Sequence, residues 1–201
     1  MKLIGMLDSP YVRRVAITLK RLGLPFTHEA VSVFSTFEQF QRINPVVKAP
    51  TLVCDGGEVL MDSTLIIQYL TALSGADLMP AALPERVRAL RIIGLALAAC
   101  EKSVQIVYEH NLRPAEKLHA PWLERVTGQL HAAYAELEKE LLARPLKADD
   151  AIEQAGIILA VAWSFTRMML GDEVTPEQYP QVASYTNSAE QLAIFRETPA
   201  T

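Results

Sequence analysis

Apolar positions in the first third of the chain change their spacing from one segment to the next. Short unbroken apolar runs are typical of buried strands, and recurrence at every third or fourth position is typical of an amphipathic helix. Gly56 and Gly57 separate two of the short runs, as in a β-hairpin. The pattern predicts strands at 2–7, 26–33, 51–55 and 58–61 and helices at 10–22, 37–44 and 62–73.

This order of segments has a direct topological consequence. A strand–helix–strand unit requires a parallel strand pair with a right-handed crossover, and the hairpin then adds antiparallel strands. We therefore expect a small mixed sheet in a first domain at residues 1–76. Residues 77–84 contain two prolines and no regular apolar spacing, which predicts a linker.

After the linker, the apolar spacing is helical throughout, and we expect an all-α domain at 85–201. The segment 151–170 is apolar on nearly all sides, which is typical of a buried central helix. The pattern predicts long helices at 85–111, 121–143 and 151–170 and shorter ones near 176–185 and 187–196.

Composition excludes several classes of protein. The 201 residues carry a formal net charge of −4, and no basic run points to nucleic acid or an anionic membrane. The N-terminal apolar run is too short for a signal peptide and Asp8 interrupts it, so we expect a cytoplasmic protein. Cys54 and Cys100 are far apart and the four histidines have no ligand spacing, so we expect reduced thiols and no metal site.

The first predicted helix begins with a serine followed by a proline. Ser9 suits the N-cap position and Pro10 the first helical position. The unpaired N–H groups of a helix N-terminus stabilise an anion, and a serine hydroxyl adds one more donor. No histidine lies near Ser9 in the sequence, which argues against a serine hydrolase. A plain helix cap is the simpler interpretation of Ser9, and a donor to a bound thiolate is the alternative.

Two further segments offer polar groups at the ends of predicted strands. A cis Ala49–Pro50 bond would expose the N–H and C=O of Ala49 to a ligand, although cis is the minority isomer at about 5–6 % of X–Pro bonds. Asp62 and Ser63 open the third helix, where a carboxylate, a hydroxyl and unpaired N–H groups suit an α-amino-acid head group. Simple capping explains Asp62 and Ser63 equally well.

Together, the segments "SPYVRR", "NPVVKAPTL" and "MDS", in this order and spacing, resemble the glutathione S-transferase family, in particular its bacterial YibF-like group. The resemblance covers nearly the whole chain and implies a thioredoxin-like βαβαββα domain followed by an all-α domain. It implies that Ser9 hydrogen-bonds the glutathione sulfur. It further implies that Ala49 pairs with the cysteinyl part beside a cis Pro50, and that Asp62 and Ser63 bind the γ-glutamyl end.

The resemblance also implies Lys48 for the glycine carboxylate and a pocket for an electrophile between the domains. The residues implied for that pocket are Val104, Val107, Tyr108 and Arg113. The implied activity is transfer of the thiolate of glutathione, the co-substrate, to a small hydrophobic electrophile by a cytosolic homodimer. Two alternatives stay open: a non-catalytic glutathione-binding or protein-interaction module of the same fold, and a glutathione-dependent reductase or peroxidase.

Two departures from the family pattern bear on the chemistry. Ser9 stands where thioredoxin-like redox enzymes carry cysteine, and neither Cys54 nor Cys100 is placed to replace it, which argues against thiol–disulfide exchange by the enzyme. Asp8 adds a negative charge beside the expected thiolate, which raises the thiol pKa unless the carboxylate points away.

A third departure concerns the predicted central helix. The capping box of the family falls on Ala151 and Gln154, neither of which suits it. The segment from Asp150 to Glu153 is therefore expected to act as a shifted capping box.

Overall fold

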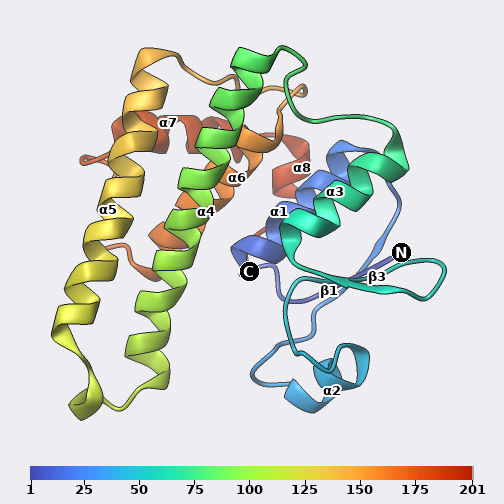
Figure 1. The fold of residues 1–201 in the computed structure, drawn as a ribbon, viewed down its shortest axis with the longest axis horizontal. Helices are drawn as coiled ribbons and strands as arrows, with labels where there is room; N and C mark the ends of the chain where they lie inside the picture. Colours follow the sequence, from blue (N-terminus) through green and yellow to red (C-terminus); the bar gives the residue numbers. More distant parts are fainter. Residues whose placement is uncertain (201) are drawn as a thin grey trace. The chain divides into compact units, whose positions relative to one another are not determined.

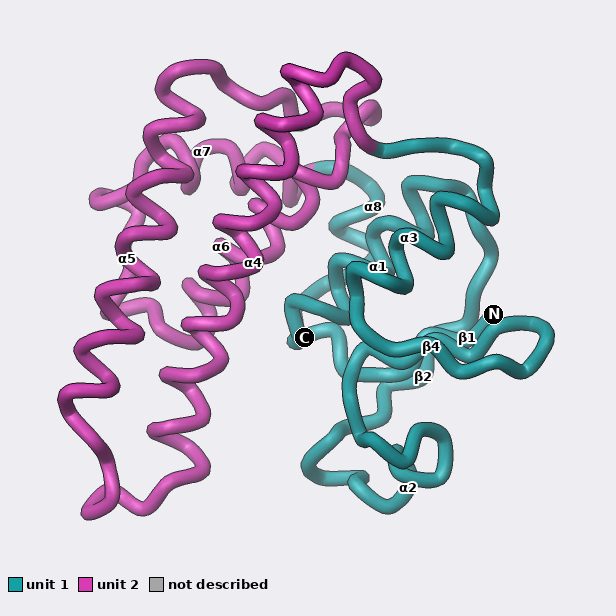
Figure 2. The backbone as a smooth tube through the Cα atoms, viewed as in Figure 1, with its two compact units in different colours: residues 1–78, 192–201 teal, residues 79–191 magenta. Residues whose placement is uncertain are grey.

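The computed structural model describes residues 1–200 and divides the chain into two compact units (Figure 2). Unit 1 contains Met1–Leu78 and the C-terminal segment from Leu192, and unit 2 contains Met79–Gln191. The boundary at Leu78 lies inside the predicted linker. The segment from Leu192, expected in the helical domain, instead makes its contacts within unit 1.

Unit 1 is built on a four-stranded sheet with the order β2-β1-β3-β4, of which Figure 1 labels the two central strands, β1 and β3. β1 (Lys2–Ile4) pairs in parallel with β2 (Thr27–Glu29) and antiparallel with β3 (Thr51–Val53), which pairs antiparallel with β4 (Val59–Met61). The predicted parallel pair, hairpin and mixed sheet are confirmed. The strands are shorter than predicted, and β1 stops before Gly5, whose φ of 135° no longer suits a strand.

Helices cover both faces of this sheet. Because successive strand residues point to opposite faces, Leu3 and Ile4 belong to different hydrophobic clusters. Leu3 packs with α1 (Pro10–Arg21) and α3 (Ser63–Ser74), and Ile4 packs with α2 (Phe37–Ile43). The first domain is therefore a helix–sheet–helix sandwich, as the thioredoxin-like prediction requires.

α1 is buried on almost all sides. The apolar residues Val12, Val15, Ala16 and Leu19 are buried, but so are the neighbouring Arg13 and Arg14, at 3 % and 2 % exposure. Arg13 Nε donates to the carbonyl of Thr198 at 2.8 Å, and its guanidinium lies 5.6 Å from the centre of the Phe195 ring in α8 (Ala193–Arg196). The C-terminal segment therefore covers the face of α1 that carries Arg13.

Unit 2 contains helices only, apart from the turn η1 (Ala115–Lys117), among the residues described. α4 (Leu83–Leu112) and α5 (Ala120–Ala143) pack against each other, α4 also packs on α6 (Gln154–Met169), and α7 (Pro180–Ala189) contacts both α5 and α6. α6 is buried along most of its length, which confirms the predicted central helix.

The start of α6 differs from the prediction. Its N-cap is Glu153, whose side chain makes no cap hydrogen bond, so the shifted capping box at Asp150–Glu153 is wrong. Asp149 instead closes a turn ahead of the helix, accepting from the N–H of Ala151 at 2.9 Å. The helix therefore begins three residues later than expected.

The C-terminal helices also differ, because a contact from another helix sets where α7 begins. The buried carboxylate of Glu138 on α5 accepts from the N–H groups of Gln181 and Val182, at 2.9 and 3.0 Å. These N–H groups belong to the first turn of α7, which runs unbroken across the gap predicted between 185 and 187.

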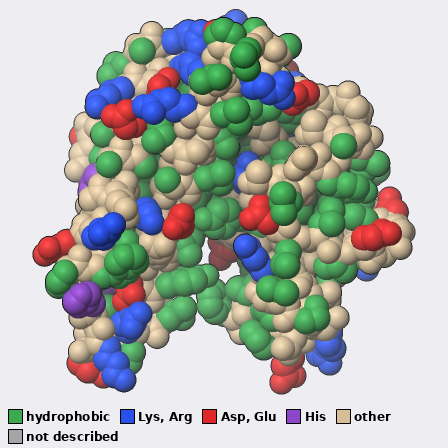
Figure 3. Space-filling model, in the orientation of Figure 1, with side chains coloured by type: hydrophobic (Ala, Val, Ile, Leu, Met, Phe, Trp, Pro, Cys, Tyr) green, Lys and Arg blue, Asp and Glu red, His purple; other side chains and the backbone are tan. Residues whose placement is uncertain are grey.

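The surface carries charges of both signs. On the face shown in Figure 3, acidic and basic side chains lie among one another and among hydrophobic ones. Within residues 1–200, every helix is too short or too polar to traverse a bilayer.

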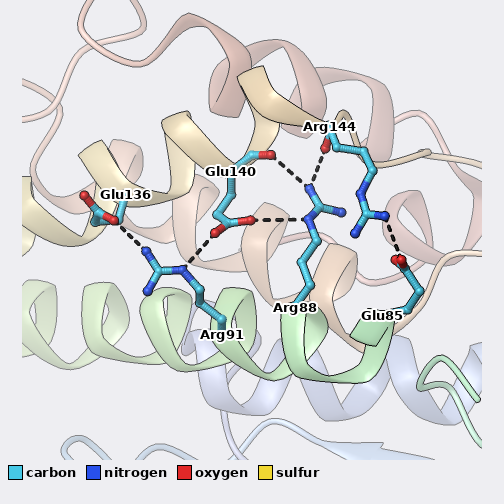
Figure 4. Close-up of polar contacts among 6 residues, drawn as sticks. All are labelled: Glu85, Arg88, Arg91, Glu136, Glu140 and Arg144. Atoms are coloured by element: carbon cyan, nitrogen blue, oxygen red, sulfur yellow. Dashed lines mark hydrogen bonds and ion pairs between the residues drawn. The ribbon is translucent and has the colours of Figure 1, made fainter. Parts of the chain in front are cut away.

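Charged side chains join α4 to α5 (Figure 4). The residues involved are Glu85, Arg88, Arg91, Glu136, Glu140 and Arg144. Arg91 contacts both Glu136 and Glu140, and Arg88 Nε lies 3.3 Å from a Glu140 carboxylate oxygen. These ion pairs are half-buried or exposed, so each contributes modestly and is screened by salt.

Stability of this cluster depends on pH with a definite sign. A hydrogen bond from Arg144 lowers the pKa of Glu85, and one from Lys139 lowers that of Glu136. A lowered folded-state pKa adds stability above the unfolded pKa of 4.5, and this stability is lost as pH falls through the folded-state value. Replacing both glutamates by glutamine should lower Tm by about one or two degrees at pH 7. The difference should shrink as pH falls below 4.5 and the glutamates of the wild type become protonated.

Thermal unfolding followed by circular dichroism tests this expectation. Glu124→Gln is the matched control, because this exposed glutamate of α5 has no ion pair among the described residues. A Tm difference for the double variant that persists unchanged at about pH 3 contradicts the assignment.

Candidate functional site

The three segments predicted to form the site emerge at one edge of the unit 1 sheet. Ile4 at the end of β1 lies opposite Thr51 at the start of β3, which lies opposite Met61 at the end of β4. The chain that follows Ile4, precedes Thr51 and follows Met61 therefore leaves the sheet side by side. These are the segments that carry Ser9, Lys48–Pro50 and Asp62–Ser63.

Gly5 lets two of these segments approach closely. Its φ of 135° is rare for residues with a side chain. A Cβ at this position would lie 2.6 Å from a side-chain methyl of Val12 in α1 and 3.2 Å from the Cβ of Ala49. The missing side chain thus allows the first turns of α1 and the Ala49 turn to pack against the same point.

Ser9 is the N-cap residue of α1 by its backbone alone. Its carbonyl accepts from the N–H of Arg13 at 3.0 Å, but its side chain makes no cap hydrogen bond. The plain side-chain cap suggested by local sequence is therefore not formed. Ser9 is half-buried, and its hydroxyl stands at the N-terminus of α1, where unpaired backbone N–H groups favour an anion. The neighbouring Asp8 is exposed.

Asn44 shapes the turn that presents Ala49. Its buried side chain donates to the hydroxyl of Thr51 at 2.9 Å, and that hydroxyl donates to the carbonyl of Lys48 at 2.8 Å. The Ala49–Pro50 peptide bond that follows is cis, as the family resemblance implies. Sequence analysis did not identify Asn44, although an asparagine between a helix and a proline is a recognisable turn signal.

Asp62 is a true side-chain cap of α3. One carboxylate oxygen accepts from the N–H groups of Thr64 and Leu65 at 2.9 and 3.4 Å. The other lies 3.9 Å from Nζ of Lys48, so the second and third segments meet at opposite charges. The capping interpretation is confirmed for Asp62, whereas Ser63 is the buried first residue of the helix.

Arg14 joins α1 to the same end of α3. Its Nη1 lies 3.3 Å from the hydroxyl oxygens of both Ser63 and Thr64. Sequence analysis assigned no role to Arg14. The available signal was its place between the apolar positions Val12 and Val15, where an exposed arginine is not expected.

The residues predicted for the electrophile pocket lie in unit 2, along the second half of α4 and just beyond it. Val107 is buried, Val104 is half-buried and Tyr108 is exposed. Arg113 forms an ion pair with Glu109 at 2.6 Å. Their role in a pocket stays a prediction.

Neither cysteine lies in the three segments that form this site. Cys54 and Cys100 are buried and form no disulfide, in agreement with the prediction of reduced thiols. Among residues 1–200, no three His, Cys, Asp or Glu side chains gather in a way that could hold a metal ion.

The close approach at Gly5 makes a testable prediction about stability. Gly5→Ala should lower the free energy of unfolding through its positive φ and through the clash with Val12. Gly57→Ala, in the β3–β4 hairpin, is the matched control, since Gly57 has a φ of 95° but no atom within 4 Å of its missing Cβ. Urea unfolding should show a loss about 1–3 kcal/mol larger for Gly5→Ala than for Gly57→Ala. Equal losses would mean that the packing around Gly5 is unimportant.

Comparison with known proteins identifies the family of this chain. Residues 3–77 match the family model described as the glutathione S-transferase N-terminal domain. The uncharacterized GST-like protein YibF of Escherichia coli (strain K12) is 31 % identical over 166 residues, which cover 81 % of this chain and 80 % of YibF.

Solved structures agree over the whole length of the chain. A glutathione S-transferase of Methylobacterium radiotolerans, in complex with glutathione sulfonate, has a TM-score of 0.89 at 24 % identity over 98 % of this chain and 93 % of its own. A glutathione transferase family member of Pseudomonas fluorescens Pf-5, with bound glutathione, has a TM-score of 0.82 at 28 % identity over 98 % and 97 %. The chain, with its thioredoxin-like and all-α parts, belongs to the glutathione S-transferase family.

Proposed function

We propose that this protein binds glutathione at the sheet edge of unit 1 and transfers its thiolate to a small hydrophobic electrophile. The observation that carries the proposal is the convergence at one edge of the Ser9 helix start, the Ala49 turn and the Asp62 helix start. Relatives solved with glutathione or glutathione sulfonate support the same ligand. A homodimer in the cytoplasm is part of this proposal.

Each segment offers groups that suit one part of the tripeptide. The carboxylate of Asp62 suits the γ-glutamyl ammonium, and the hydroxyl and N–H of Ser63 suit the γ-glutamyl carboxylate. The backbone of Ala49, beside the cis bond to Pro50, would pair with the cysteinyl part. Lys48 would reach the glycine carboxylate from the adjoining turn.

The Ser9 hydroxyl would then act on the sulfur. A neutral thiol attacks carbon slowly, and the thiolate is the nucleophile. A hydroxyl donor and the N-terminus of α1 favour the charged sulfur, which increases the thiolate population at neutral pH. The thiol proton goes to solvent, and attack by the thiolate forms a carbon–sulfur bond. In a substitution, the leaving group departs with its bonding electron pair. In an addition, the π electron pair of the double bond moves to the neighbouring atom, which takes up a proton from solvent.

Glutathione affinity tests the γ-glutamyl contact. Asp62→Asn keeps a good N-cap residue but removes the negative charge, so glutathione should bind about ten-fold or more weakly with little change in Tm. Asp62→Ala removes both cap and charge and should lower affinity and Tm together. Isothermal titration calorimetry measures affinity. Unchanged affinity in both variants, or no binding by the wild type, rejects the site and favours an interaction module.

Conjugation kinetics and the thiol pKa of bound glutathione test Ser9. Ser9→Ala should raise this pKa and slow conjugation about ten-fold or more, with nearly unchanged glutathione affinity. The fold should lose little stability, because the hydroxyl makes no cap hydrogen bond. Asp8→Asn should move the pKa the opposite way, since it removes a negative charge near the thiolate.

Thiolate absorbance in the ultraviolet, recorded against pH, measures the pKa. An unshifted pKa with full activity in Ser9→Ala removes this residue from the mechanism. Binding without turnover of any electrophile would point to a non-catalytic glutathione-binding protein. Turnover of peroxides or disulfides instead would point to a glutathione-dependent reductase.

A further inference from the structure

Arg14 places a permanent positive charge behind the end of the site that Ser63 forms. An arginine side chain keeps its charge inside a protein and can only donate hydrogen bonds. Arg14 is 2 % exposed, and one of its nitrogens faces the hydroxyl oxygens of Ser63 and Thr64, each at 3.3 Å. Both hydroxyls therefore act as acceptors toward α1.

This arrangement sets which way the Ser63 hydroxyl acts. An oxygen that accepts from a guanidinium keeps its own proton for another partner. That partner must be an acceptor, and it must lie away from Arg14. Ser63 can thus donate to a ligand, and the positive charge behind its oxygen strengthens that donation.

The backbone of α3 points to the same partner. The first N–H groups of a helix have no acceptor within the helix. The Asp62 carboxylate accepts from the N–H groups of Thr64 and Leu65, and the Asp62 carbonyl accepts from the N–H of Ile66. The N–H of Ser63 is not among these cap bonds, so the hydroxyl and N–H of one residue are left for one acceptor group.

Charge balance decides what kind of acceptor fits. Asp62 carries a negative charge beside Ser63, which alone would repel an anion. Arg14 below the hydroxyls and Lys48, 3.9 Å from Asp62, offset that charge. A ligand group with an ammonium beside Asp62 and a carboxylate beside Ser63 therefore fits both the negative and the positive charges of this end of the site.

We propose that Arg14 is a positioning residue that makes this end of the site specific for an ionised carboxylate. Acting through Ser63, it selects the free α-carboxylate of the γ-glutamyl group against a neutral amide of the same shape. The inference rests on the proposed glutathione site. It adds a specificity-determining residue that does not itself touch the ligand.

The test compares glutathione with a glutathione analogue whose γ-glutamyl α-carboxylate is a primary amide. Calorimetric titration of the wild type should show glutathione binding at least about ten-fold more tightly than the amide. In Arg14→Gln, the two affinities should lie within about three-fold of each other. Arg14→Lys keeps the charge but not the planar fork, and should show an intermediate preference.

Arg13→Gln is the matched control. Arg13 is the neighbouring buried arginine of α1, but it donates to the carbonyl of Thr198 and lies over the Phe195 ring, both in the C-terminal segment. This variant should lose stability and keep the wild-type ratio of affinities. Weaker binding from a damaged fold lowers both affinities, whereas loss of the proposed role changes their ratio.

The outcomes separate this inference from the proposed function. A wild-type ratio in both Arg14 variants, or no preference in the wild type, overturns the role of Arg14 and leaves glutathione binding intact. No binding of glutathione by the folded wild type overturns both. If Arg14→Gln does not fold, Ser63→Ala decides, because it removes the hydroxyl through which Arg14 acts. A ratio equal to that of the wild type in Ser63→Ala overturns the inference.

Discussion

Two consecutive arginines of α1, Arg13 and Arg14, are buried although their guanidinium groups keep their charge, and distant segments of unit 1 pack against them. Burying a charge is costly unless hydrogen-bond partners and nearby charges compensate. Arg13 turns to the C-terminal segment and Arg14 to the start of α3. These two contacts bring distant parts of the sequence onto the helix that begins with Ser9.

The spacing of apolar residues predicted most of the fold, because it reports which side of each element faces a core. It yielded the order of strands and helices, the mixed sheet and the buried helix α6. It could not show contacts that depend on partners far along the chain. Glu138 sets the start of α7 from another helix, and Thr198 covers Arg13 from the end of the chain.

The candidate site was predictable to a different extent. The residue types of the site and their order were recognisable from the sequence. The structure has the cis bond before Pro50 and the helix cap at Asp62 that these residues led us to expect. The supporting residues were not found, because Gly5, Arg14 and Asn44 act through close approach and buried hydrogen bonds. Among residues 1–200, positive φ values outside glycine occur at Asp62, which belongs to this site, and at Val47, which directly precedes Lys48. Strained backbone of this kind persists where surrounding contacts over-determine it.

The return of the C-terminal segment to unit 1 makes that unit discontinuous in sequence, with unit 2 inserted between its two pieces. A growing chain emerges from its N-terminus, so the first 78 residues are made long before the segment that covers α1. Unit 2 has all of its residues available earlier and can complete its core first. Completion of unit 1 therefore waits until the segment from Leu192 has been synthesised, which happens only after every residue of unit 2 has been made.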